Sequence, residues 1–154
     1  MMEIEATISW KRQPHEAFSD QRYSRAHTWR FDGGAQVAAS SSPHIVPLPY
    51  SEPAFVDPEE AYVASLSSCH MLVFLAIAAR QGYVIDGYDD RATGVMEKNE
   101  QGRLYVSRVT LRPRVLYRGA APDAATDHAL HHQAHEQCFI ANSVRTVVET
   151  VLQH

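Results

Sequence analysis

The sequence has few cysteines and no excess of positive charge. The 154-residue chain contains two cysteines, Cys69 and Cys138, and 14 Lys and Arg residues against 18 Asp and Glu residues, which gives a net charge of -4. Two cysteines do not make the disulfide framework of a small secreted protein, and a nucleic-acid-binding protein normally carries a basic face. We therefore expect no nucleic-acid partner, and thiols that are catalytic, metal-binding or incidental rather than structural.

The N-terminus also lacks a targeting pattern. Met1-Met2-Glu3-Ile4-Glu5 does not show the positively charged and then apolar run of a signal peptide. The chain contains no repeat, low-complexity tract or linker, and with 45% hydrophobic residues it can bury a sizeable core. We expect a single domain over residues 1–154, located in the cytoplasm.

One long helix is predicted between Asp57 and Gly82. Asp57 is a good N-cap, Pro58 suits the first helical position, and Glu60 follows three residues after the cap to complete a capping box. Gly82 can adopt the left-handed conformation that ends a helix. Apolar or small residues occupy nearly every face between them, which predicts a helix that is buried on all sides.

This helix is about 20 residues long, which is also the length of a membrane span. Ser65, Ser67, Ser68 and His70 interrupt its apolar run, and two glutamates open it. No second candidate span or flanking basic cluster accompanies it. We therefore interpret it as the core helix of a soluble protein and expect no membrane partner.

The rest of the chain predicts strands and one further helix. Alternating or β-branched residues predict strands over 3–10, 22–31, 35–39, 83–95, 104–117 and 143–152. Asp32-Gly33 predicts a hairpin turn, and Pro113 indicates an edge strand or a bulge. Helix-forming residues over 122–137 predict the second helix. Together these elements predict one α+β domain.

The segment 40–53, rich in serine and proline, predicts a loop ahead of the long helix. Its apolar side chains, Ile45 and Leu48 among them, fit two roles. They can cover a bulky apolar ligand, or they can pack onto the core of the domain itself.

Cys69 has two interpretations. A free cysteine in a buried helix is usually a small hydrophobic residue. However, Ser67, Ser68 and His70 lie beside it, and burying polar groups without partners is costly. Their presence indicates that something polar, such as a pocket, faces this turn of the helix.

Cys138 follows a histidine-rich segment. His128, His131, His132 and His135 are spaced by three and four residues, so pairs of them share a helix face and could bind zinc together with Cys138 or Cys69. The alternative is a solvated helix end, where imidazoles suit the helix dipole. No C-x-x-C spacing of a typical zinc motif is present.

In combination, these residues resemble the OsmC/Ohr family of hydroperoxide-reducing proteins, and its OsmC-like branch in particular. The resemblance rests on Pro58-Glu59-Glu60, on Cys69-His70 ten residues after Glu59, and on Ala134-His135-Glu136-Gln137-Cys138 leading into Asn142-Ser143-Val144. Tyr23 to Trp29 also looks like the corresponding family strand. The resemblance implies an OsmC-like fold, with antiparallel sheets, two main helices of which the central one is buried, and an intertwined homodimer.

The resemblance further implies a cysteine-based organic hydroperoxide reductase that acts in oxidative-stress defence without a cofactor or metal. Cys69 would be the peroxidatic cysteine and Cys138 the resolving one, and an external dithiol, such as a lipoyl group on a partner protein, would reduce their redox-active disulfide. Glu59 and Arg25, with Arg22 as second choice, would order the reactive thiolate. The alternative on the same fold is a metal- or small-molecule-binding protein that uses the segment His128–Cys138 without peroxidase turnover.

The spacing of Glu59 and Cys69 adds a constraint. Ten residues of straight helix span ~15 Å, so Glu59 cannot touch the cysteine of its own helix. Either Arg25 bridges the two residues, the helix is broken between them, or Glu59 serves the partner subunit. Phe139 follows Cys138 where many family members have proline, which alters how the second thiol is presented.

Overall fold

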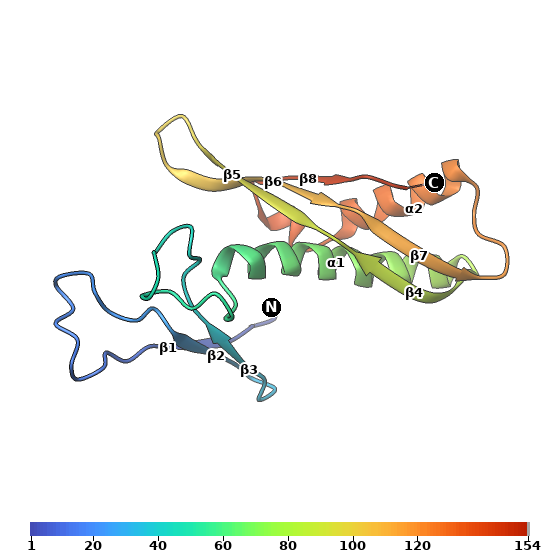
Figure 1. The fold of residues 1–154 in the computed structure, drawn as a ribbon. Helices are drawn as coiled ribbons and strands as arrows, with labels where there is room; N and C mark the ends of the chain where they lie inside the picture. The colour runs from blue at the N-terminus through green and yellow to red at the C-terminus, as the bar shows by residue number, and fades with distance from the viewer. Residues whose placement is uncertain (154) are drawn as a thin grey trace. The chain divides into compact units, whose positions relative to one another are not determined.

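The computed structural model describes residues 1–153 and divides the chain into two compact units (Figure 1). The first unit is Met1–Ala61, and the second begins at Tyr62. The long helix α1 (Pro58–Arg80) starts in the first unit and continues into the second. The single OsmC-like domain over residues 1–154 stays a prediction.

The first unit is built on a three-stranded antiparallel sheet of β1 (Ala6–Ser9), β2 (His27–Phe31) and β3 (Gln36–Ala39). The turn after β2 is closed by Gly34 in the left-handed region, with φ of 91°. The strand predicted over 22–31 is too long, because residues 22–26 belong to the β1–β2 loop. Trp10, Phe18 and Tyr23 hold that loop together through aromatic contacts with centroids 4.6 to 5.8 Å apart.

The predicted start and end of α1 are confirmed. The Glu60 amide donates to the Asp57 carboxylate over 2.8 Å, and the Asp57 amide donates to the Glu60 carboxylate over 2.8 Å. This is the reciprocal capping box. After Arg80, Gly82 adopts a φ of 85° and ends the helix.

Burial of α1 is confined to one stripe, so the prediction of burial on all sides is wrong for the single chain. The buried residues are Leu66, His70, Phe74, Ile77 and Ala78, which recur every three or four positions along one face. Leu72, on another face, is 61% exposed. Among the described helices α1 alone is long and apolar enough to cross a membrane, a test that core helices of soluble proteins also pass.

The second unit contains two small sheets. The first pairs β4 (Val84–Asp90) with β7 (Pro113–Arg118), and the second has the order β5 (Thr93–Lys98), β6 (Leu104–Leu111) and β8 (Val147–Thr150). All pairs are antiparallel except β6 with β8, which is parallel.

The strands predicted over 83–95 and 104–117 are each broken in two. Both breaks fall where the chain changes strand partners, between β4 and β5 and between β6 and β7. At this crossing the Arg112 amide donates to the Asp90 carboxylate over 2.6 Å, and Pro113, which has no amide hydrogen, begins β7. Since β7 is an edge strand of the two-stranded sheet, the expectation of an edge strand at Pro113 is confirmed.

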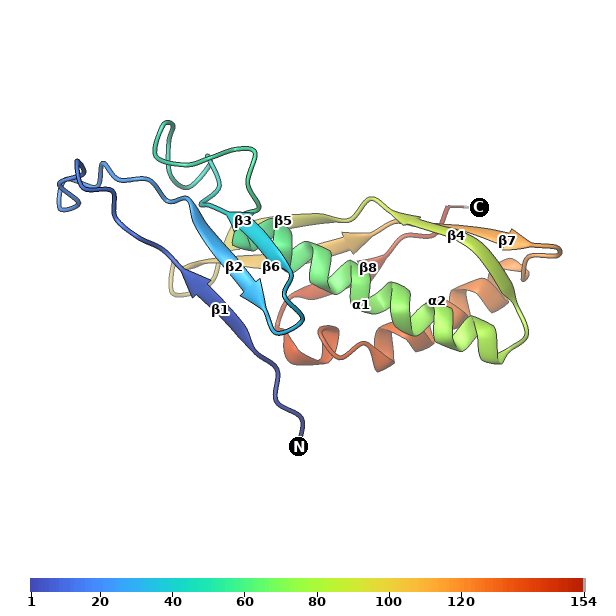
Figure 2. The same ribbon diagram turned by 90° about the horizontal axis from the view of Figure 1, so that it is seen from below.

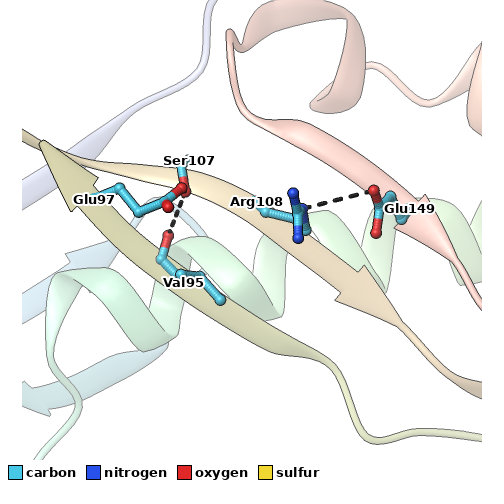
Figure 3. A network of polar contacts seen from close by, with 5 residues as sticks. All are labelled: Val95, Glu97, Ser107, Arg108 and Glu149. Carbon is cyan, nitrogen blue, oxygen red and sulfur yellow. Dashed lines mark hydrogen bonds and ion pairs between the residues drawn. The ribbon is translucent and has the colours of Figure 1, made fainter. Parts of the chain in front are cut away.

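Polar side chains link the strands of the β5–β6–β8 sheet (Figure 3). The Ser107 hydroxyl on β6 contacts the Glu97 carboxylate and the Val95 carbonyl on β5. On the other side of β6, Arg108 pairs with Glu149 of β8 over 3.6 Å. The arginine and the glutamate are about half exposed, so this ion pair contributes little stability.

The second helix, α2 (Ala124–Gln137), is capped by Asp123, whose carboxylate accepts from the Thr126 amide over 2.8 Å. Figure 2 shows α1 and α2 side by side on the same face of the strands. The core between them contains Phe74, Ile77 and Ala78 of α1 with Leu130 and Ala134 of α2. Partly buried side chains of β4 and β7 cover this core.

Gly94 of β5 gives a prediction about packing between the sheet and α1. A Cβ atom at Gly94 would lie 2.7 Å from Cγ2 of Val63, and a β-branched side chain on a helix has little freedom to move away. We expect Gly94→Ala to lower the free energy of unfolding by about 1–3 kcal/mol, as overpacked cores do. Equilibrium unfolding in urea measures the change.

Gly33→Ala is the matched control, because a Cβ atom there meets no atom within 4 Å. It should change the free energy of unfolding by less than about 0.5 kcal/mol. Equal stability of the two variants would show that Val63 does not restrict position 94.

Candidate functional site

Cys69 and Cys138 come together in the second unit, although 69 positions separate them in the sequence. Cys69 lies in the middle of α1, and Cys138 is the C-cap of α2, where its amide donates to the His135 carbonyl. The two thiols are neighbours, close enough that Cys69 raises the pKa of Cys138. The packing of α1 against α2 therefore brings the two cysteines into one region, without a disulfide in the present structure.

The two thiols differ in their surroundings. Cys69 is partly exposed, whereas the Cys138 side chain is 1% exposed. Burial, followed by the neighbouring Cys69 thiol, raises the pKa of the Cys138 thiol. The backbone amides of Ala141 and Ile140 oppose this shift, and the Ala141 amide donates to the Cys138 sulfur over 3.4 Å.

A buried pair of histidines joins the same two helices. His70, the neighbour of Cys69, contacts His131 of α2 with 3.0 Å between Nε2 and Nδ1. Both side chains are almost fully buried, and His131 also stacks on Phe74 with centroids 4.1 Å apart. In this contact one ring donates and the other accepts, which requires the accepting imidazole to be neutral.

Burial is the main reason that both histidines stay neutral. It lowers the pKa of His70 to about 4, with a further contribution from His131. It also lowers the pKa of His131 to about 4, with a contribution from His128. The 3.8 Å approach of His131 to Asp127 is therefore not an ion pair near neutral pH. Asp127 instead accepts a hydrogen bond from the Tyr117 hydroxyl over 3.2 Å.

Two of the polar residues that interrupt α1, Ser67 and His70, have polar partners in the second unit, although Nδ1 of His70 is buried without one among the described residues. The Ser67 hydroxyl donates to the Asp90 carboxylate over 2.5 Å, and His70 contacts His131. The sequence indicated polar surroundings for this turn of the helix. It did not identify Asp90 or the histidine pair, because these contacts join residues 23 and 61 positions apart.

Glu59 lies in the first turn of α1, and one of its carboxylate oxygens, Oε2, is buried without a hydrogen-bond partner in the described chain. Burial, followed by a hydrogen bond with Asp57, raises the pKa of Glu59. The helix is unbroken over Pro58–Arg80, so one of the three explanations for the spacing of Glu59 and Cys69 is wrong. An unpartnered buried carboxylate oxygen is a position that a guanidinium group would satisfy.

Arg25 does not pair with Glu59 in the described residues. Its guanidinium group lies 3.6 Å from the centre of the Tyr23 ring and donates to the carbonyls of Gln21 and Tyr23. Arg22, the second choice, donates to the Tyr50 hydroxyl over 2.9 Å. Both arginines belong to the β1–β2 loop of the first unit. The pairing of Glu59 with Arg25 stays a prediction.

The histidine-rich helix face does not form a metal centre in residues 1–153. His128, His131, His132 and His135 line a hollow of about 150 Å³ beside β8. However, no three His, Cys, Asp or Glu side chains in the described part of the chain converge as metal ligands do. His131 is instead engaged with His70.

An apolar groove of about 600 Å³ lies between α1 and the residues that follow α2. Leu72, Val73 and Ala76 form its wall on α1, and Phe139, which is 76% exposed, forms the opposite wall. Leu72 and Val73 lie three and four positions after Cys69, which places them one helical turn further along the same side of α1. The groove therefore begins close to the cysteine pair.

The chain is thus an α+β protein with two helices, which place a partly exposed cysteine beside a buried one. Residues 51–153 match the family described as OsmC-like protein. The chain belongs to the OsmC family, as its cysteine and glutamate motifs predicted.

The solved structures agree with this assignment. An OsmC-like protein of unknown function from Vibrio cholerae is 55% identical, with a TM-score of 0.96, and the match covers 99% of this chain and 100% of that one. An organic hydroperoxide resistance protein from Elizabethkingia anophelis is 18% identical, with a TM-score of 0.69, over 99% of this chain and 94% of that one. The organic hydroperoxide resistance protein OhrB of Bacillus subtilis is 19% identical, with a TM-score of 0.67, over 99% and 98%. The curated proteins contain no match to this chain.

These likenesses confirm the predicted fold, with antiparallel sheets and two helices. At identities below 25%, the hydroperoxide resistance proteins show that the fold is shared. What they do is a property of those proteins, and the activity of this chain has to be argued from its own residues.

Proposed function

We propose that the protein reduces organic hydroperoxides by thiol chemistry, with Cys69 as the peroxidatic cysteine and Cys138 as the resolving cysteine. The observation that carries the proposal is that the partly exposed Cys69 is a neighbour of the buried Cys138. The attacking sulfur must be reachable by the peroxide, and the resolving sulfur must be close enough to follow. Membership of the OsmC family supports the same assignment.

The chemistry proceeds in two steps. The Cys69 thiolate attacks the terminal oxygen of the hydroperoxide, the O–O bond breaks, and an alcohol and a Cys69 sulfenic acid form. The Cys138 sulfur then attacks the Cys69 sulfur, water leaves, and a disulfide forms. An external dithiol reduces the disulfide, so the cycle that we propose needs no metal or cofactor.

The proposed substrate is an organic rather than a purely polar peroxide. The groove of Leu72, Val73, Ala76 and Phe139 offers apolar surface next to the cysteine pair, which suits a hydrocarbon substituent. A lipoyl group or another small dithiol, free or on a partner protein, is the proposed reductant. The cytoplasm is the proposed compartment for this reaction.

Glu59 and Arg25 are proposed to order the thiolate. A guanidinium group beside Cys69 would favour the charged thiolate, and a bidentate pair with Glu59 would hold that guanidinium in place. The unpartnered Oε2 of Glu59 supports this role. Because Arg25 is held on Tyr23 instead, the pairing requires that the arginine move or that Glu59 accept an arginine of a partner subunit.

A homodimer is the proposed assembly. Exposed apolar side chains outside the groove, among them Val84, Leu116 and Val147, offer surface that a second copy can bury. If Glu59 serves the partner subunit, a variant that is monomeric in solution should lose peroxidase activity. Full turnover by a verified monomer would overturn this part of the proposal.

A steady-state assay tests the proposed activity. Consumption of cumene hydroperoxide is followed with dihydrolipoamide or dithiothreitol in excess, in the presence of a metal chelator, against a reaction without protein. We expect saturable consumption that the chelator does not inhibit, and slower consumption of hydrogen peroxide than of cumene hydroperoxide. Consumption no faster than with the dithiol alone would overturn the proposal.

A further inference from the structure

The two sulfur atoms of the cysteine pair differ in how they can be reached from solvent. The Cys69 side chain is partly exposed on α1, whereas Cys138 is 1% exposed at the C-cap of α2. A thiolate that reduces a disulfide must approach one sulfur directly, opposite to the sulfur that leaves. Access alone therefore favours attack on Cys69.

The backbone around Cys138 prepares that sulfur to leave. After α2 the chain turns into a short 3-10 helix over Ala141–Ser143, and the Ala141 amide, at its first position, donates to the Cys138 sulfur over 3.4 Å. The Ile140 amide also stabilises a negative charge on this sulfur. Amide hydrogens that point at a sulfur stabilise its thiolate without needing a charged side chain.

Burial of Cys138 acts against its role as the leaving group. Burial raises the pKa of Cys138, and a thiol of higher pKa leaves a disulfide more slowly. The pKa of the leaving thiol changes the rate of such an exchange only in part, because nucleophilicity and leaving tendency change by less than the full shift in pKa. Access acts as a threshold, since attack on a sulfur that is 1% exposed first requires the helices to separate. We conclude that the difference in exposure, rather than the pKa of Cys138, determines which sulfur is attacked.

We infer that the dithiol that reduces the Cys69–Cys138 disulfide attacks the sulfur of Cys69, and that Cys138 leaves as a thiolate that accepts a hydrogen bond from the Ala141 amide. This inference rests on the proposed function and specifies its reductive half. One thiolate of the dithiol forms a bond to the Cys69 sulfur while the bond between the two cysteines breaks. Cys138 then takes up a proton. The second thiol of the reductant attacks its own mixed disulfide, which releases Cys69 and a cyclic disulfide.

A trapping experiment locates the attack. The full-length protein is oxidised with diamide, which forms a disulfide without any hydroperoxide, and is then exposed briefly to limiting 2-mercaptoethanol. Acid stops the exchange, and N-ethylmaleimide labels free thiols under denaturing conditions. Peptide mass spectrometry then shows which cysteine carries mercaptoethanol and which carries maleimide. We expect mercaptoethanol on Cys69 and maleimide on Cys138, at least about tenfold more often than the reverse.

The same exchange in denaturant is the matched control, because it removes the fold and keeps both thiols. There the mercaptoethanol should distribute over both cysteines. An adduct mainly on Cys138, or an equal distribution in the folded protein, would overturn the inference. Failure of the proposed function gives a different result. A protein that does not react with hydroperoxide but carries mercaptoethanol on Cys69 would refute the peroxidase activity and support Cys69 as the site of attack. If diamide forms no Cys69–Cys138 disulfide, both are refuted.

Discussion

Replacing Cys69 with serine should lower the rate of cumene hydroperoxide consumption at least about 1,000-fold, because the hydroxyl of serine is not ionised near neutral pH and does not replace a thiolate nucleophile. Replacing Cys138 with serine should have a different effect. Cys69 is still able to attack the first equivalent of hydroperoxide, but no resolving thiol follows. Activity should then decay during repeated turnover as the sulfenic acid is oxidised further.

Ser68→Ala is the matched control for this pair of variants. Ser68 precedes Cys69 on α1 and is exposed, so its replacement leaves the thiol contact in place. Its rate should stay within about twofold of the wild-type rate. Stopped-flow measurement of the first turnover and a steady-state assay separate the two cysteine roles. A Cys69→Ser protein that keeps its activity would show that the chemistry does not use this thiol.

Acid should destabilise the protein strongly between pH 6.5 and pH 4. His70 and His131 are neutral in the fold with a pKa of about 4, whereas an unfolded histidine has a pKa near 6.5. Between these values the unfolded chain binds more protons, so stability is fully present above pH 6.5 and is lost as the pH falls. The difference in pKa corresponds to roughly 3 kcal/mol for each imidazole.

The contact between the rings explains why acid is harmful here. When both imidazoles carry a proton on each nitrogen, neither can accept from the other across 3.0 Å, and two positive charges lie between α1 and α2. His135 adds to this repulsion, while Asp90 opposes it at His70. Asp127 is the acidic group nearest to His131, at 3.8 Å. The prediction is therefore a weakened contact between the two helices that carry the cysteines.

Urea unfolding of a double variant tests the acid effect. In His70→Leu/His131→Leu both rings are replaced by apolar side chains of similar size, which avoids leaving one buried polar partner alone. This variant should lose several kcal/mol less stability than the wild type between pH 6.5 and pH 4.5. His132→Leu, at an exposed position of α2, should behave like the wild type. An identical pH dependence of the double variant and the wild type would contradict the account.

The parts of the fold that sequence could predict are those set by local chemistry. Asp57, Glu60 and Gly82 fixed the ends of α1, since capping depends on residues only a few positions apart. The structure also brings the two predicted cysteines near each other. Each of them lies on or directly after a helix that the sequence predicted. Family resemblance supplied the link between the two, which spacing alone could not.

The errors arose where tertiary contacts override local pattern. The run of β-branched residues through Leu104 to Tyr117 reads as one strand, but β6 and β7 belong to different sheets. Apolar residues on nearly every face of α1 predicted burial on all sides. Composition, however, does not tell which of these faces other parts of the same chain cover. The histidine pair was missed for a similar reason, since each ring alone resembles a solvated or a core histidine.

The measurement that tests the central claim most directly is the thiol state of the protein after one equivalent of cumene hydroperoxide, determined by mass spectrometry on wild type, Cys69→Ser and Cys138→Ser. The account predicts a rapid Cys69–Cys138 disulfide in the wild type, over-oxidised Cys69 in Cys138→Ser, and no reaction in Cys69→Ser. Two unmodified thiols in the wild-type protein would contradict it and would mean that this member of the family uses its fold for binding.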